Sequence, residues 1–178
     1  MAQLAVLTFP DSRLREPNAP VTVFDEALQK LSEDMFETMY AHDGIGLAAP
    51  QVNVHLNLVV IDIPADGEDA GSGGQLVLCN PLITALAGEQ VLSEEGCLSV
   101  PEYRDKVPRR SICSVRYQDL SGAPKELNEV GGMLAICLQH EIDHLSGKLF
   151  VDYISRLKRQ RLSAKLKKRE ALAREQHD

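Results

Sequence analysis

The segment Gln139–Lys148, with the sequence Gln-His-Glu-Ile-Asp-His-Leu-Ser-Gly-Lys, determines more about this chain than any other stretch. It carries the pattern His-Glu-x-x-His inside residues 133–146, which we predict to be a helix. Residues four apart lie above one another on one helix face, so His140 and His144 can bind a single metal ion. Glu141 stands beside them as a proton acceptor. The pattern indicates hydrolysis by a metal-activated water, and it leaves open which bond is cut.

Length and composition indicate one ordinary globular domain. The chain has 178 residues, of which 44% are hydrophobic and 25% are charged. Its longest apolar runs, such as Leu58–Ile61, are long enough for a strand and too short to span a bilayer. The first residues lack the basic segment and the long apolar segment of a signal peptide. We therefore expect a cytoplasmic protein without a membrane segment.

The charge of the chain is distributed unevenly. The net charge of -7 combines +6 from Arg156 onward with -13 in the preceding residues. We predict a catalytic domain that spans residues 1–178, with a basic C-terminal helix over residues 155–178 as an appendage. An acidic body with a basic end indicates an anionic partner for that end alone.

Periodicity predicts an α+β fold. Apolar residues recur at three- and four-residue steps over 24–40, which indicates a first amphipathic helix. A Gly-rich loop is expected at 65–74. Runs rich in Val, Ile and Leu, bounded by turn residues, predict strands at 56–63, 76–79, 85–92, 111–117 and 125–129. We expect small antiparallel sheets packed around a central metal-binding helix, with a helix at the C-terminus.

A hydrolytic metal site needs about three protein ligands and one open position for water. Downstream of the two histidines the chain offers only a Lys-rich helix and His177. Upstream, the segment Glu95–Ser99 carries Cys97 directly after Gly96, where the backbone can approach closely. Cys97 is therefore a candidate third ligand. Spacing alone does not prove that it meets the histidines, and any of the four cysteines is more often a buried thiol: Cys79, Cys97, Cys113 and Cys137.

The segment Gly44–Gln51, with the sequence Gly-Ile-Gly-Leu-Ala-Ala-Pro-Gln, has little side-chain bulk. Such a segment suits a backbone that lies against an extended ligand. Gln51 carries an amide donor that can face a developing oxyanion. The alternative is an irregular turn with a solvent-facing Gln.

Together, the segments Gly44–Gln51, Glu95–Ser99 and Gln139–His144 resemble the three signature motifs of peptide deformylases, in order and spacing. The resemblance extends over nearly the whole chain, and the long C-terminal helix resembles that of the Gram-negative type. It implies that Cys97, His140 and His144 bind one divalent metal. The resemblance implies Fe(II) as the native ion, with Zn, Ni or Co able to replace it, whereas the donor set alone suits zinc equally well.

The resemblance also implies the reaction, which is removal of the formyl group from the N-terminal formyl-methionine of newly synthesised proteins, with release of formate. Glu141 then carries the proton from water to the departing amine, and the oxyanion meets the Gln51 amide and the backbone N–H of Leu98. We expect the remaining substrate-binding residues to be Gly44, Ile45, Gly46, Glu95, Gly96, Met133, Ile136 and Cys137.

Further expectations concern supporting residues and partners. Glu95 is expected to pair with Arg109 and brace the Cys97 loop, and Asp143 is expected to be structural. In similar deformylases the basic helix docks on the ribosome, which makes the ribosome a candidate partner, and nothing demands more than a monomer. One alternative is a zinc endopeptidase of the His-Glu-x-x-His type. Another is a non-catalytic ribosome-associated module, for which Cys79 or Cys113 would complete a closed metal site.

Overall fold

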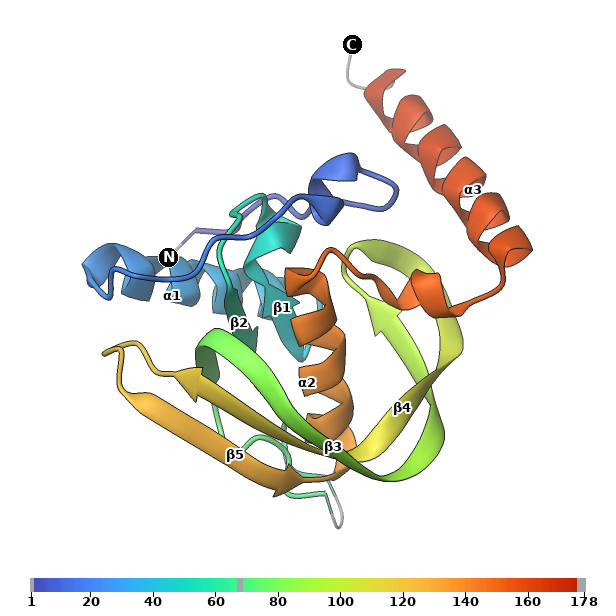
Figure 1. Ribbon diagram of the computed structural model, residues 1–178. Helices are drawn as coiled ribbons and strands as arrows, with labels where there is room; N and C mark the ends of the chain where they lie inside the picture. Colours follow the sequence, from blue (N-terminus) through green and yellow to red (C-terminus); the bar gives the residue numbers. More distant parts are fainter. Residues whose placement is uncertain (1, 67–68, 176–178) are drawn as a thin grey trace.

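The computed structural model describes residues 2–66 and 69–175. Within these residues, five strands form one antiparallel sheet in the order β1-β2-β3-β4-β5. The sheet curves around helix α2, which occupies the centre of the molecule (Figure 1). The predicted α+β fold is confirmed, and its strands join in a single sheet. Apart from two short 3-10 helices, η1 (Ser12–Arg15) and η2 (Ala49–Val52), the elements before α2 are α1 (Glu26–Ala41), β1 (Gly46–Ala48), β2 (Leu58–Ile61), β3 (Leu76–Cys97), β4 (Val100–Gln118) and β5 (Pro124–Val130).

Two long strands form most of the sheet. β3 and β4 pair from Cys79 opposite Gln118 to Cys97 opposite Val100, with several shifts of register that let them bend. The prediction that a strand ends at Asn80–Pro81 is wrong. Asn80 adopts a φ of 51°, and pairing resumes at Leu82, so the proline sits within a register shift where its missing N–H costs no ladder bond. This continuation carries the chain directly to Cys97.

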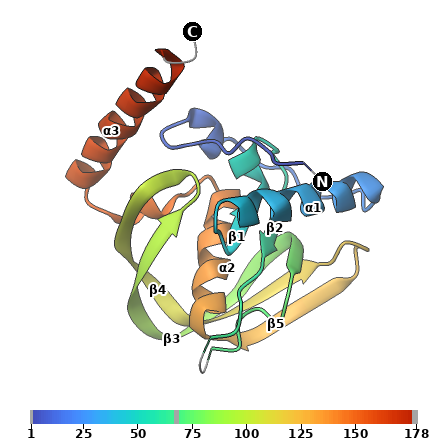
Figure 2. The ribbon, with the colours of Figure 1, turned by 180° about the vertical axis from the view of Figure 1, so that it is seen from behind.

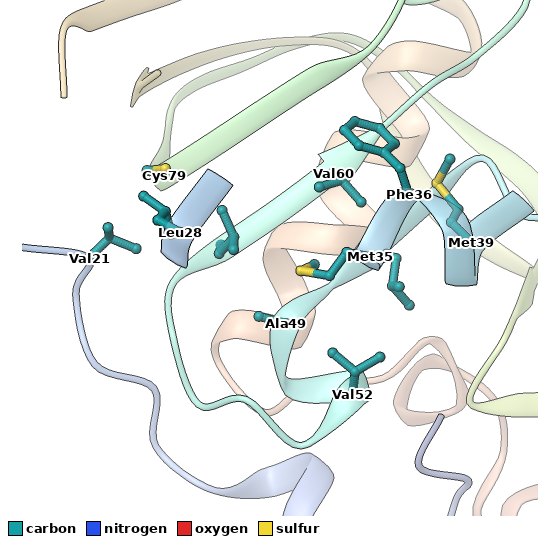
Figure 3. Close-up of a cluster of buried hydrophobic side chains, with 11 residues drawn as sticks. Val21, Leu28, Met35, Phe36, Met39, Ala49, Val52, Val60 and Cys79 are labelled. Atoms are coloured by element: carbon teal, nitrogen blue, oxygen red, sulfur yellow. The ribbon is translucent and has the colours of Figure 1, made fainter. Parts of the chain in front are cut away.

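Helix α1 covers one face of the short strands β1 and β2. The side chain of Asp25 accepts a hydrogen bond from the Leu28 N–H, which caps the first turn. The buried face of the helix, including Leu28, Met35 and Met39, packs against Val60 (Figure 3). This packing holds β1 in place beside the central helix.

Helix α2 (Gly132–Leu145) is apolar enough to be buried on most sides. Leu134, Ala135 and Leu138 pack against the inner face of the sheet. The helix ends as predicted, because Gly147 takes a left-handed φ of 70° and its N–H donates to the carbonyl of His144. The sheet thus fixes the rotation of the helix that carries the two histidines.

Helix α3 (Arg156–Glu175) extends past the end of the β3–β4 hairpin (Figure 2). Only Leu162 and Leu166 of this helix are buried, in a cluster with Val107 and Phe150. The division into a domain with an appended helix stays a prediction, and residues 176–178, with His177, lie outside the described residues. In the described part of the chain, no helix is both long enough and apolar enough to cross a lipid bilayer.

Candidate active site and metal centre

The three expected metal ligands lie together. Cys97 is the last residue of β3, and His140 and His144 lie one turn apart on α2. One donor atom from each residue lies within 4.8 Å of the other two, and Cys97 Sγ is 3.4 Å from Nε2 of His144. Ligand atoms about 2.0 to 2.3 Å from one tetrahedral ion stand at similar separations. The donor set therefore fits a single divalent metal.

The orientation of His140 is fixed by Glu95. Nδ1 of His140 lies 2.7 Å from Oε1 of Glu95, and both side chains are buried. An ionised carboxylate only accepts hydrogen bonds, so the proton is on Nδ1 and the lone pair of Nε2 is free for a metal. The Glu95 carboxylate thus supports a ligand, and we propose this role in place of the expected substrate contact.

Glu95 is held in turn by Arg109, which confirms the expected pairing. Nε and Nη2 of the Arg109 guanidinium donate to the two oxygens of Glu95, at 2.7 and 2.9 Å. Nη1 of Arg109 donates to Asp143, at 2.7 Å, and Asp143 also accepts from the Tyr153 hydroxyl. Burial raises the pKa of Glu95, but the hydrogen bonds from Arg109 and His140 lower it below its ordinary value. A buried cation thus sits between two carboxylates.

The Glu141 carboxylate is buried beside the ligands. Among the described residues, its Oε2 has no hydrogen-bond partner. Burial raises the pKa of Glu141 to about 7. A Cβ built on Gly46 of β1 would stand 2.6 Å from Oε1 of Glu141 and 2.8 Å from Sγ of Cys137. Glycine at this position therefore allows β1 to approach α2 so closely.

Gln51 lies in the site, and the alternative of a solvent-facing turn is wrong. The short helix η2 (Ala49–Val52) places the side chain inside the molecule, where it is 1% exposed. Its Oε1 accepts from the Ala48 N–H, at 2.9 Å, and its Nε2 donates to Cys97 Sγ, at 3.3 Å, and to Ser99 Oγ, at 3.1 Å. The side-chain amide is thus held in one orientation next to the metal ligands.

A cavity of about 770 Å³ opens onto these groups. Its walls include Gln51, Leu98, Glu141 and all the residues that we expected to bind the substrate. His140 and Cys97 also line it. Gly46, the first residue of β1, lines the cavity, and β1 pairs with β2 along its other edge. The cavity therefore combines a metal-ligand set, a buried carboxylate and the start of β1.

Sequence reasoning missed some of the supporting residues. Ser99, which binds the Gln51 amide, and Tyr153, which binds Asp143, were not expected at the site. Ser99 follows Cys97 in the same segment, whereas Tyr153 gives no pattern that connects it with the site. The other candidate cysteines, Cys79 and Cys113, lie in two separate buried clusters, and burial raises the pKa of each thiol to about 11.

Comparison with known proteins agrees with this geometry. Residues 3–160 match the family model described as polypeptide deformylase. A peptide deformylase of Hahella chejuensis (strain KCTC 2396) is 49% identical over 168 residues, which are 94% of this chain and 96% of that protein. The crystal structure of a peptide deformylase from Legionella pneumophila matches with a TM-score of 0.86 and 48% identity, over 97% of this chain and 98% of that one.

A second crystal structure, of peptide deformylase from Ehrlichia chaffeensis in complex with actinonin, matches with a TM-score of 0.89 and 42% identity. That match covers 96% of this chain and 99% of the other. The family model, the identity over nearly the full length and the shared fold agree. The chain therefore belongs to the polypeptide deformylase family.

Proposed function

We propose that Cys97, His140 and His144 hold the metal ion of this deformylase and that Glu141 transfers the proton in its reaction. The reaction itself follows from the family: the chain is a metal-dependent hydrolase that removes the formyl group from N-terminal formyl-methionine and releases formate. The observation that supports our assignment most is the buried Glu141 carboxylate, whose Oε2 finds no hydrogen-bond partner in the described part of the chain and lies beside the three ligands.

When bound, the divalent metal would polarise the formyl carbonyl. It would also lower the pKa of a water molecule bound to it toward neutral pH. We propose Fe(II) as the native ion, on the basis of the resemblance. A thiolate with two imidazoles is equally suited to zinc. Three protein ligands would leave one position of a four-coordinate ion for water, as a catalytic site requires, and two of these ligands, Cys97 and His140, line the cavity.

Glu141 is placed to take a proton from the attacking water and to give it to the departing amine nitrogen. Its buried carboxylate lies beside the three ligands, where both proton transfers would take place. We propose that the Gln51 amide and the backbone N–H of Leu98 stabilise the oxyanion. The hydrogen bonds of Gln51 to Ala48 and Ser99 support this proposal, because they hold the amide in place. The other N–H of the amide, which donates to Cys97 Sγ in this structure, is the one that would turn to the oxyanion.

We propose that the peptide binds along the segment that leads into β1, through backbone pairing with Gly44, Ile45 and Gly46. This mode of binding does not read the sequence of the peptide. The apolar side chains of Met133, Ile136 and Cys137 line the same cavity and are suited to hold the methionine side chain.

The test is to incubate the Fe(II)- or Ni(II)-loaded protein, prepared without oxygen, with formyl-Met-Ala-Ser and to measure formate and free amine. Release of both in equal amounts is the expected result. Cleavage of an internal peptide bond would instead indicate an endopeptidase. That alternative is not supported by the structure, where the third candidate ligand is the upstream Cys97, or by the family match.

We further propose that helix α3 binds the ribosome and that the protein acts in the cytoplasm as a monomer on nascent chains. Exposed basic residues on α3, among them Lys165, Lys167 and Lys168, suit a phosphate backbone. Because Leu162 and Leu166 are part of the core, the test should neutralise these three lysines to Gln and not delete the helix. Co-sedimentation with ribosomes at low salt is expected to fall, and unchanged binding would contradict the proposal.

A further inference from the structure

The turn of the β3–β4 hairpin carries an unusual bulge. Glu95 pairs with Asp105 and Cys97 pairs with Val100, so the four residues Pro101–Arg104 lie opposite the single residue Gly96. Glu102, within this bulge, has a φ of 58°, which is strained for a residue with a side chain. Bulges near active sites commonly redirect a side chain. Here the whole bulge, including Glu102, lines the cavity of the active site.

Glu102 lies toward the outer end of this cavity. Its side chain is 68% exposed, whereas Glu141 and His140, at the reacting end, are buried. A peptide with its formyl group at the metal ligands must run outward, so the residues that follow the methionine pass the outer wall. The Glu102 carboxylate is therefore placed to meet those residues and not the formyl group.

The partner of Glu102 comes from a distant part of the chain. Arg169 of α3 donates to both carboxylate oxygens of Glu102, at 2.6 and 3.2 Å. Lys158 of the same helix donates to Asp105 next to the bulge, at 2.8 Å. Both side chains of the Arg169–Glu102 pair are exposed. Exposed ion pairs contribute little to the free energy of folding, so they open readily. A cation on the peptide can therefore compete with Arg169 for this carboxylate.

We propose that the Glu102 carboxylate meets the peptide residues after the formyl-methionine and that Arg169, by pairing with this carboxylate, determines how much of its negative charge the peptide meets. This inference rests on the proposed path of the peptide out of the cavity. With Arg169 in place, Glu102 is neutralised and held toward α3, so peptides of either charge are accepted. Without Arg169, the free carboxylate attracts Lys and repels Glu in the substrate.

The test compares kcat/KM for formyl-Met-Ala-Lys, formyl-Met-Ala-Glu and the reference formyl-Met-Ala-Ser. In Arg169→Gln, the ratio of the Lys peptide to the Glu peptide is expected to rise about three- to tenfold at low salt, which is the effect of one charge near a protein surface. At about 1 M salt this rise should largely disappear, because such charges are then screened. The buried side chains of Leu162 and Leu166 should keep α3 packed on the domain in this variant. An unchanged midpoint of thermal unfolding would show that the packing is preserved.

Two further variants separate the roles. Arg174→Gln is the matched control, since Arg174 pairs with Glu170 on the same helix and should leave the ratio unchanged. In the Glu102→Gln background, Arg169→Gln should change the ratio by less than half as much. If Arg169→Gln changed the ratio equally in the Glu102→Gln background, Arg169 would act on the peptide directly, and the inference would be wrong. An unchanged ratio in Arg169→Gln alone would also overturn it. If the wild type fails to deformylate even formyl-Met-Ala-Ser, the proposed function itself falls.

Discussion

Oε1 of Glu95 lies 2.7 Å from Nδ1 of His140, so the carboxylate on β3 sets the orientation of a candidate metal ligand on α2. Arg109 on β4 holds the same carboxylate with two hydrogen bonds. The sheet and the helix are thus joined by a chain of charged groups directly behind the metal ligands. Hydrogen-bond partners of this kind fix the ring and raise its basicity, so they tune metal binding without touching the metal.

This network predicts a severe defect for Arg109→Leu. The side chain of Arg109 is only 3% exposed, and its loss leaves the buried carboxylate of Glu95 and the partly buried carboxylate of Asp143 without their cation. We expect the free energy of unfolding to fall by about 3 to 5 kcal/mol, measured by urea denaturation, and the metal affinity to fall roughly 10- to 100-fold. The neighbouring Arg110→Leu is the control, because it loses one exposed bond to the Gly88 carbonyl. Equal effects of the two changes would contradict the bracing role.

Gly46→Ala is predicted to lower the activity strongly. The added methyl would stand 2.6 Å from Oε1 of Glu141, so the carboxylate must shift away from the reacting groups. We expect kcat/KM for formyl-Met-Ala-Ser to fall about 100-fold, since misplacement by an ångström has that effect. Gly131→Ala, whose Cβ would meet only Ser111 O at 3.7 Å, should retain most of the activity. A fully active Gly46→Ala would show that this close approach does not matter.

The cysteines provide a test of the ligand set. We predict that Cys97→Ala abolishes tight metal binding, because one of three donors is lost, whereas Cys113→Ala retains one metal ion per chain. Cys113 is completely buried among apolar side chains, and its thiol lies near the Ala135 carbonyl. The metal content of each variant after dialysis, measured by elemental analysis, shows which cysteine is a ligand. Metal lost from Cys113→Ala with the fold preserved would support the closed, four-ligand alternative.

The attachment of α3 predicts a dependence of stability on pH. The hydrogen bond from Lys158, together with that from Tyr103, lowers the pKa of Asp105 from 3.8 to about 2. A carboxyl group with a lowered pKa in the folded state stabilises it above the unfolded pKa, and this stability is lost as the pH falls from about 4 toward 2. The Asp105→Asn variant should therefore unfold at a lower temperature than the wild type at pH 6, with a smaller difference at pH 3. Equal differences at both pH values would contradict the account.

Local patterns in the sequence predicted the helices correctly, and the reasons are physical. The face of α1 follows from its apolar spacing, and the end of α2 follows from Gly147, which takes the left-handed conformation there. The strand from Leu76 was predicted too short, because Asn80 and Pro81 normally end a strand. Here they sit in a register shift, and only the pairing of β3 with β4 reveals that the strand continues.

The candidate site was predictable to a different degree for each residue. His140, Glu141 and His144 follow from helix geometry alone. Cys97 required the resemblance of the whole segment, because the distance between strand and helix depends on tertiary structure. The Glu95–His140 bond and the Arg169–Glu102 pair depend on hairpin register and on the docking of α3, which local sequence does not encode.

In the proposed mechanism Glu141 transfers the proton, and Cys97, His140 and His144 hold the metal. The most direct measurement compares wild type and Glu141→Gln for metal content and for formate release from formyl-Met-Ala-Ser. The substitution preserves shape and leaves the three ligands in place. We predict an unchanged metal content and a kcat lowered about 10²- to 10⁴-fold, as expected for loss of a general base and acid. A metal-loaded Glu141→Gln with nearly wild-type turnover would contradict the claim.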